Sequence, residues 1–316
     1  MTRILENATP AVSAHAGLGE SIARFALGAS IETSTKNLIE IDSYARLLPA
    51  ATDVYVTCLP GTPYHHILSI ARRLRPDGMN PVPHIAARRL VNASVASEFL
   101  ARLRDEAGVT RALVIAGDSQ AAVGPYTSSL AVLETGLLQA HGIRSGGIAG
   151  YPEGHGRISA QALLEALDAK IAYARSHGIE PFVVSQFCFD GDMVIDWLAK
   201  LRARGVTLPV RVGVAGPAKV RTLLNYGMRC GIGDSLRAFG SQPVSLTRLL
   251  MRHGPEKAVR AIAQSAAGLG IAGLHFFPFG GFAESARWIS KVSTGRFGLT
   301  ASGEGFTLED DTRASA

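Results

Sequence analysis

The feature that most constrains the fold of this chain is a repeated alternation of short apolar, β-rich runs with longer amphipathic stretches. Eight such runs lie at residues 29–32, 54–57, 82–86, 112–117, 147–151, 182–187, 210–214 and 273–277. The stretches between them, such as 64–75, 95–106, 159–177, 193–204 and 218–226, carry apolar residues three and four apart, the spacing of a helix with one buried face. Eight βα repeats predict an α/β fold in which a parallel sheet closes into a (β/α)8 TIM barrel.

The interval between the last two runs is longer than a plain repeat requires. Residues 245–253 and 256–267 have helical patterns there, so we expect extra helices before the last strand. The glycine pattern at 268–273 ends a helix and opens a strand, the reverse of a dinucleotide-binding loop, and therefore predicts a turn. We expect one catalytic domain over residues 1–298, followed by a disordered tail at 299–316, which is polar and acidic.

Charge and cysteine content narrow the class of protein. The formal net charge is +6, but no run of five like charges occurs, which favours small-molecule partners over nucleic acid. Three cysteines without a CxxC spacing indicate a reducing, cytoplasmic setting. The first residues do not resemble a leader, and no stretch approaches ~18 continuous apolar residues, so we expect neither export nor membrane contact. The histidines at 65, 66 and 155 lack a third ligand at a suitable spacing, so we expect no metal site.

Polar residues follow six of the eight predicted strands. In a parallel barrel the carboxyl ends of the strands meet at one rim, where active sites form. The residues at these ends are Glu32, Thr57, His84, Asp118, Tyr151 and Gln186. Each alone has a structural explanation; Asp118, for example, has the sequence context of a helix cap. Together they predict an active site, because burying acids without partners is costly and a rim has few structural reasons to gather them.

Several segments carry a more specific pattern. Residues 116–118 (Ala-Gly-Asp), 149–155 (Ala-Gly-Tyr-Pro-Glu-Gly-His) and 185–190 (Ser-Gln-Phe-Cys-Phe-Asp), with Tyr126 and Lys170 between them, resemble the methylenetetrahydrofolate reductases in order and spacing. The resemblance extends from about Ser30 to Phe277. It implies an oxidoreductase that contains FAD and interconverts 5,10-methylenetetrahydrofolate and 5-methyltetrahydrofolate, with NAD(P)H as co-substrate. We expect a homo-oligomer without a regulatory domain.

The resemblance also implies roles for individual residues. Glu32 matches the family's general acid, Asp118 the aspartate beside the flavin ring, and Gln186 the amide that contacts the folate pterin. Tyr226 lies where the family often has a phenylalanine packed on folate or nicotinamide. The positions that match flavin contacts are Thr57, His84, Gly117, Asp118, Tyr126, Tyr151, His155 and Lys170.

The chemistry implied by the resemblance requires an acid of this kind. Methylenetetrahydrofolate accepts hydride only after its bridging ring opens to an iminium, and ring opening requires protonation of a nitrogen leaving group. A carboxyl group whose pKa is raised by desolvation can hold that proton at neutral pH. We therefore assign proton donation to Glu32.

The chain also departs from the family pattern. Ala116 stands where an arginine is usual, Leu163 and Ala166 where polar residues are expected, and 280–281 (Gly-Gly) where an arginine often meets the folate tail. These departures predict incomplete flavin occupancy and different tail recognition. Three alternatives remain: methyltetrahydrofolate oxidation in a demethylation pathway, a reductase that transfers hydride directly without flavin, and a non-catalytic folate- or flavin-binding barrel.

Overall fold

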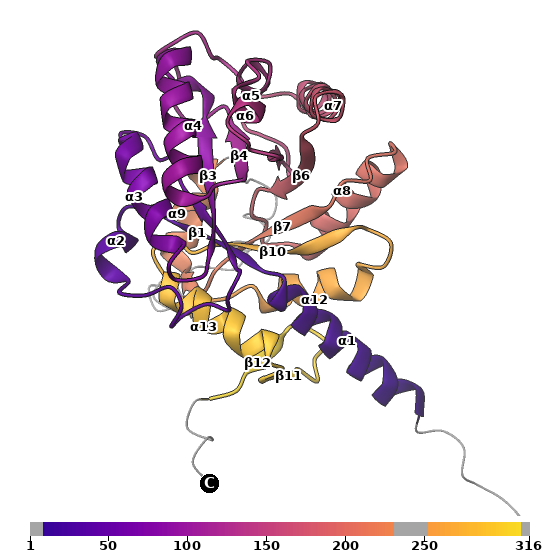
Figure 1. Cartoon of the computed structure of the whole chain (residues 1–316). Coiled ribbons are helices and arrows are strands. Elements are labelled where there is room, and N and C mark those ends of the chain that lie inside the picture. Colours follow the sequence, from indigo (N-terminus) through magenta and orange to yellow (C-terminus); the bar gives the residue numbers. More distant parts are fainter. Residues whose placement is uncertain (1–8, 231–251, 311–316) are drawn as a thin grey trace, which may run out of the picture.

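The eight predicted strands form a closed parallel barrel in a computed structural model that describes residues 9–230 and 252–310 (Figure 1). The strand order around the barrel is β1-β10-β7-β6-β5-β4-β3-β2, so the first and last strands pair and close the sheet. The strands are β1 (Ser30–Thr33), β2 (Asp53–Val56), β3 (Asn80–Ala86), β4 (Arg111–Ile115), β5 (Ser145–Gly150), β6 (Glu180–Ser185), β7 (Val210–Ala215) and β10 (Ile271–Phe277). The predicted (β/α)8 barrel is thereby confirmed.

Helices follow the strands and cover the outside of the barrel. They are α2 (Asn37–Glu40), α3 (Tyr64–Leu74), α4 (Ala93–Ala107), α5 (Ser129–Leu133), α6 (Leu137–Ala140), α7 (Ala160–Ser176), α8 (Gly191–Ala203), α9 (Val220–Cys230), α12 (Glu256–Ser265) and α13 (Phe282–Ser293), with a 3-10 turn at Ala87–Arg89. Their ends follow local chemistry: the Asn92 side chain accepts from Val95 N at the start of α4, and Gly108 ends it in a left-handed conformation. No helix within the described ranges is long and apolar enough to cross a membrane.

Two expectations for the long seventh crossover have different outcomes. The helix predicted at 256–267 is confirmed as α12. The helix predicted at 245–253 lies outside the described residues except for Arg252 and His253, where the prediction is wrong. These two residues form β9, which pairs antiparallel with β8 (Ala218–Lys219). Because Ala218 and Lys219 are held in this pair, the helix predicted from 218 starts at Val220.

The C-terminal segment corrects the prediction of a disordered tail. β11 (Phe297–Leu299) and β12 (Phe306–Leu308) form an antiparallel hairpin. The Phe306 ring is buried against Trp288 of α13 at a centroid distance of 5.8 Å, and Arg260 Nη1 donates to the backbone oxygens of Thr300 and Gly305. Phe306 thus anchors this segment, and Leu299 and Leu308 pack against the same core. Residues 311–316 lie outside the described part.

An N-terminal helix, α1 (Thr9–Leu27), precedes the barrel and was not predicted. It lies beside α13 and α12, on the side of the barrel where β11 and β12 are also found (Figure 1). Ile22 and Ala26 of this helix are fully buried. The helix therefore covers the side of the barrel where its first and last strands meet.

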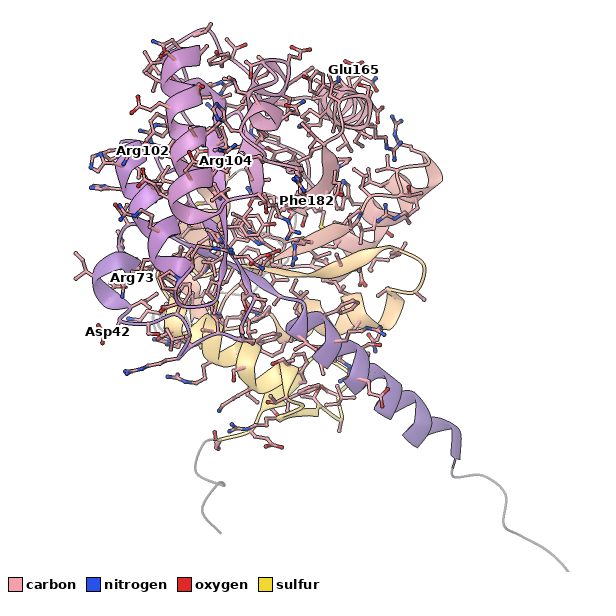
Figure 2. The ribbon with its side chains drawn as sticks, in the orientation of Figure 1. Asp42, Arg73, Arg102, Arg104, Glu165 and Phe182 are labelled. Atoms are coloured by element: carbon pink, nitrogen blue, oxygen red, sulfur yellow. The ribbon has the colours of Figure 1, made fainter. Side chains whose placement is uncertain are left out.

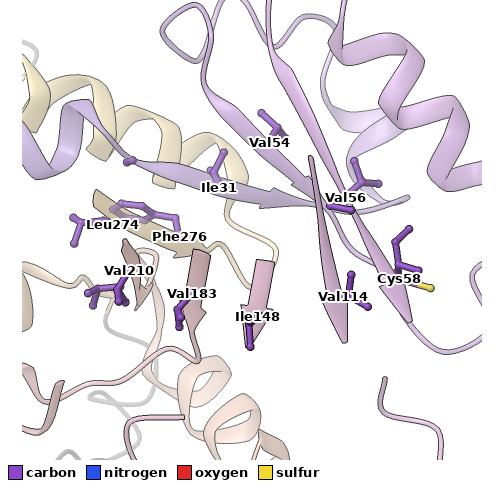
Figure 3. Packing of buried hydrophobic residues seen from close by; sticks show 14 of the residues in the cluster. Ile31, Val54, Val56, Cys58, Val114, Ile148, Val183, Val210, Leu274 and Phe276 are labelled. Carbon is purple, nitrogen blue, oxygen red and sulfur yellow. The ribbon is translucent and has the colours of Figure 1, made fainter. Parts of the chain in front are cut away.

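The barrel has apolar layers on both sides of its strands. Outward-facing residues such as Val54, Val56 and Phe276 pack under the helices (Figure 3). Inside the barrel a smaller cluster contains Tyr55, Val82, Leu113, Phe182 and Val184. Figure 2 shows Phe182 of this inner cluster toward the middle of the view, whereas Arg102 and Glu165 lie on the outer helices α4 and α7.

An ionic group fills the amino-terminal end of the barrel interior. Asp53, the first residue of β2, accepts from Arg111 at 2.5 Å and from Arg211 at 2.7 Å. Asn80 Nδ2 also lies 3.3 Å from Asp53 Oδ1. Because this end is closed by paired charges and the middle by apolar side chains, the carboxyl rim is the end at which a ligand has room to bind.

Candidate active site

A cavity of about 620 Å³ opens at the carboxyl rim. Its walls come from the ends of β4, β5 and β6, the loops that follow them, and Phe277 of β10. This volume is in the range of small-molecule and cofactor sites. Five of the residues predicted from the sequence line it: Gly117, Asp118, Tyr151, His155 and Gln186.

The turn out of β4 places Asp118 in this cavity. Gly117 has φ +89°, and a Cβ atom there would lie 3.1 Å from Ala86 Cβ, so glycine suits the turn both conformationally and sterically. Beyond it, Arg88 holds the loop: its Nη1 donates to Ser119 O and its Nε to Thr127 O, each at 3.1 Å. Arg88 was not among the predicted site residues, although the basic pair that it forms with Arg89 was an available signal for an anion contact.

The walls from β5 and β6 carry ordered polar side chains. The rings of Tyr151 and His155 meet edge to face at 5.4 Å, and His155 Nδ1 accepts from the backbone N–H of Arg157 at 3.2 Å. Burial lowers the pKa of His155, with a further contribution from the Arg157 charge, so the ring favours its neutral form. Gln186 Oε1 accepts from the backbone N–H of Phe187 at 3.2 Å, which fixes the orientation of the amide.

Glu32 lies inside the barrel in a cluster of aromatic and imidazole groups. Its Oε1 is 3.7 Å from His84 Nε2 and 3.7 Å from His275 Nε2. Tyr55 packs against both imidazoles, with centroid distances of 6.1 and 4.4 Å. The Glu32 side chain keeps 17% of its surface exposed, whereas that of His275 has none. Glu32 is therefore the member of this cluster through which protons can reach the rim.

Burial sets the charge state of this cluster. Desolvation raises the pKa of Glu32 to about 7; the nearby His84 opposes the rise and the Asp118 charge adds to it. Desolvation lowers the pKa of His84 to about 4 and that of His275 to about 3. At neutral pH both imidazoles are uncharged, and Glu32 is divided between its acid and its carboxylate. An acid poised near working pH is what proton-transfer catalysis requires.

His275 was missed by the sequence analysis. It lies in the middle of the apolar run of the eighth strand, whereas the rim residues were taken from the ends of the first six strands. The available signal was a lone histidine among apolar residues, at a position where alternation along β10 points it into the barrel.

Besides Glu32 and Tyr226, four predicted cofactor residues do not line the cavity. Thr57 Oγ1 donates to Thr33 O at 3.1 Å, and His84 contacts Glu32 as described. Tyr126 is buried in the apolar core. Lys170 is buried within α7, where desolvation lowers its pKa to about 8. Their assignment to flavin binding stays a prediction.

Tyr226 joins an aromatic cluster beside the cavity. Its ring packs on Phe279 at 4.5 Å, Phe279 on Phe187 at 4.8 Å, and Phe187 on the cavity residue Phe277 at 5.3 Å. Phe279 has φ +49°, an uncommon conformation for a non-glycine residue. Backbone strain of this kind often accompanies functional sites, and the cluster reaches the cavity through Phe277, the member that lines it.

Comparison with known proteins adds little about activity. No family model matches the chain. Among solved structures, the chain is similar to the GH18 chitinase ChiB from the chitin utilization locus of Flavobacterium johnsoniae, with a TM-score of 0.43, 11% identity, and coverage of 84% of this chain and 93% of that chain. It is also similar to a dihydropyrimidinase from Brevibacillus agri, with a TM-score of 0.33, 15% identity, and coverage of 63% and 41%. Similarity at this level carries no functional argument. Within the described residues, no group of three or more His, Cys, Asp or Glu side chains is placed to hold a metal ion.

Proposed function

We propose that this protein is an oxidoreductase of the methylenetetrahydrofolate reductase type, which interconverts 5,10-methylenetetrahydrofolate and 5-methyltetrahydrofolate. The observation that carries the proposal is the position and charge state of Glu32. Its carboxyl group, with a pKa of about 7, lies inside the barrel below the rim, close enough to Asp118 for that charge to contribute to the pKa. Together with Gln186, these are the residues that the resemblance assigns to acid catalysis, flavin tuning and pterin binding.

The cavity suits a flavin ring. Its volume of about 620 Å³ accommodates a flat three-ring system, with apolar surface from Ile115, Ala149 and Phe277 and polar groups from Asp118 and Gln186. Gly117, Tyr151 and His155 would hold the ring and its attached chain. When bound, a flavin supplies hydride transfer between nicotinamide and the folate carbon.

In this proposal Glu32 controls proton transfer to the substrate. Its proton passes to the amine nitrogen of the bridging ring, the carbon–nitrogen bond breaks, and the folate iminium that results can accept hydride. The carboxylate left on Glu32 regains a proton from solvent through its exposed face. Asp118 lies in the cavity wall, where its charge disfavours additional negative charge nearby.

Gln186 and the aromatic cluster supply binding rather than chemistry. The Gln186 amide, held by Phe187 N–H, offers polar atoms to the edge of a pterin. Tyr226 and Phe279 present rings that are tilted by 32° with their centroids 4.5 Å apart, and a planar heterocycle can pack on them.

One observation favours a second candidate, a reductase without flavin. Tyr126 and Lys170, two of the residues matched to flavin contacts, are buried away from the cavity lining, and Ala116 replaces the usual arginine. In that case nicotinamide would occupy the cavity and pass hydride to folate directly, with the same acid role for Glu32.

The experiment that tests both candidates combines a spectrum with turnover. The freshly purified protein is examined for flavin absorbance bands, and NADH oxidation by methylenetetrahydrofolate is followed with and without added FAD. We expect visible flavin bands and an increase in activity when FAD is added. A colourless protein with full activity in the absence of FAD establishes direct transfer, and no folate activity under any condition overturns the proposal.

A further inference from the structure

A hydrogen-bonded pair lies directly below Glu32 in the barrel interior. Ser30, two residues earlier on β1, has its Oγ 2.8 Å from His275 Nδ1 and 3.4 Å from Leu274 O. Both side chains are fully buried. The other ring nitrogen, His275 Nε2, faces Glu32 Oε1 at 3.7 Å. This nitrogen has no hydrogen-bond partner in the described structure, although it is buried.

The backbone oxygen of Leu274 determines how this pair can share its protons. A carbonyl oxygen only accepts, so the Ser30 hydroxyl bonds to both neighbours only if it donates to Leu274 O and accepts from His275 Nδ1–H. A neutral imidazole carries one N–H, so Nε2 then has a free lone pair. The opposite tautomer would leave the Leu274 contact unused and aim an N–H at Glu32.

We propose that Ser30 and His275 are positioning residues that hold Glu32 in its protonated form, by presenting a bare Nε2 as the acceptor for the carboxyl proton. That this proton is used in catalysis rests on the proposed function. The arrangement of Ser30, His275 and Glu32 does not. A hydrogen bond to the neutral form of a carboxyl group disfavours its ionisation. The Ser30–His275 pair and burial therefore both favour the protonated form of Glu32.

Two neighbouring groups, His84 Nε2 and Tyr55 Oη, are also buried without a hydrogen-bond partner in the described structure, so the Ser30 contact is what distinguishes His275. His84 on β3 and Tyr55 on β2 also face Glu32, and Asp118 lies beyond it at the rim. Arg211 on β7, whose charge acts on His275, is paired with Asp53 at the closed end of the barrel. His275 stays uncharged, because burial and the Arg211 charge both lower its pKa. The 3.7 Å between Nε2 and Oε1 exceeds hydrogen-bond distance, so the two groups must move closer together before His275 accepts the hydrogen bond, which it does without taking the proton.

The tautomer of His275 is measured first, in the unmodified protein. Two-bond nitrogen–proton NMR spectra of protein labelled at its nine histidines distinguish Nδ1–H from Nε2–H, and the signals are assigned through their loss in His275→Gln. We expect Nδ1–H at His275. An Nε2–H tautomer overturns the proposal. In Ser30→Ala the Nδ1–H preference should be lost, while His84, which lies at the same distance from Glu32, keeps its signals and serves as the internal control.

The second measurement is the pKa of Glu32 by carbon NMR of labelled carboxyl groups. In His275→Phe the ring volume and burial are retained but the acceptor is removed. We expect the pKa of Glu32 to fall by about one unit, and His275→Gln, whose amide oxygen can accept, to recover part of the difference. An unchanged or higher pKa in His275→Phe contradicts the proposal, since burial alone predicts that result.

Neither measurement uses substrate or cofactor. An Nδ1–H tautomer and a lowered pKa, found in a protein with no folate activity, therefore contradict the proposed function alone. If the protein has folate activity but His275 is the Nε2–H tautomer, only the proposed role of Ser30 and His275 is contradicted.

Discussion

The buried carboxyl group of Glu32 predicts a specific dependence of stability on pH. Glu32→Gln keeps the size and most hydrogen bonds of the side chain but removes its ionisation. In the folded protein the pKa of Glu32 is raised from 4.5 to about 7, chiefly by desolvation. Between these two values the folded state binds a proton that the unfolded state has released. The stability that this proton provides is complete below the unfolded pKa and is lost as pH rises through 7.

The size of the effect follows from the two pKa values. One pKa unit corresponds to about 1.4 kcal/mol, so moving a carboxyl pKa from 4.5 to about 7 costs the folded state about 3 kcal/mol once the group is ionised. The glutamine variant does not lose this stability, because its amide does not ionise. Relative to wild type, Glu32→Gln should therefore gain about 3 kcal/mol in free energy of unfolding between about pH 5 and about pH 9.

Urea unfolding of both proteins at the two pH values measures this difference. Contributions from other ionisable groups, including the two buried histidines, largely cancel because both proteins contain them. Glu98→Gln, at an exposed position on α4, is the matched control and should follow wild type throughout. If the free energy of unfolding of Glu32→Gln has the same pH dependence as that of wild type, Glu32 has an ordinary pKa in the folded state. That result refutes the inference that Glu32 holds a proton near neutral pH.

Three further predictions concern the cavity and the C-terminal hairpin. Gln186→Leu should weaken folate binding by about 1–3 kcal/mol and leave nicotinamide binding unchanged, because polar atoms of the pterin lose their partner; steady-state KM values for both substrates measure this, and equal losses mean that Gln186 is structural. Gly117→Ala should lower the free energy of unfolding by about 1–3 kcal/mol, because alanine is strained at φ +89°; urea unfolding with no loss shows that the turn adapts. Phe306→Ala should lower it by about 3–5 kcal/mol through the cavity left against Trp288, whereas a hairpin that is not packed on the barrel gives no change.

Much of this architecture follows from periodicity. The eight strands were predicted because apolar runs bounded by helical patterns have few other solutions, and the rim residues followed from the rule that strand ends converge. Of the six strand-end residues, Asp118, Tyr151 and Gln186 line one cavity, whereas Glu32, Thr57 and His84 do not. Their convergence is a property of the fold, so it needs no information beyond strand order.

The residues that sequence analysis missed depend on tertiary contacts. His275 looks apolar by context, and only barrel closure, which pairs β10 with β1, brings it to Glu32. Arg88 has no motif, and its role arises from carbonyl oxygens some thirty to forty residues further along the chain. The tail was predicted to be disordered because a single phenylalanine in a polar segment is a weak signal for order. Phe306 is ordered because its ring packs against Trp288.

The most direct test of the proposed chemistry separates two half-reactions in Glu32→Gln. Stopped-flow absorbance of the FAD-loaded protein follows reduction by NADH, which needs no acid, and then reoxidation by methylenetetrahydrofolate, which does. We predict that reduction keeps its wild-type rate and that reoxidation slows by about 10²–10⁴-fold, the usual contribution of a general acid. Reoxidation at the wild-type rate would contradict the assignment of Glu32 as proton donor. An equal loss of rate in both half-reactions would show that Glu32 maintains the structure of the site and does not donate the proton.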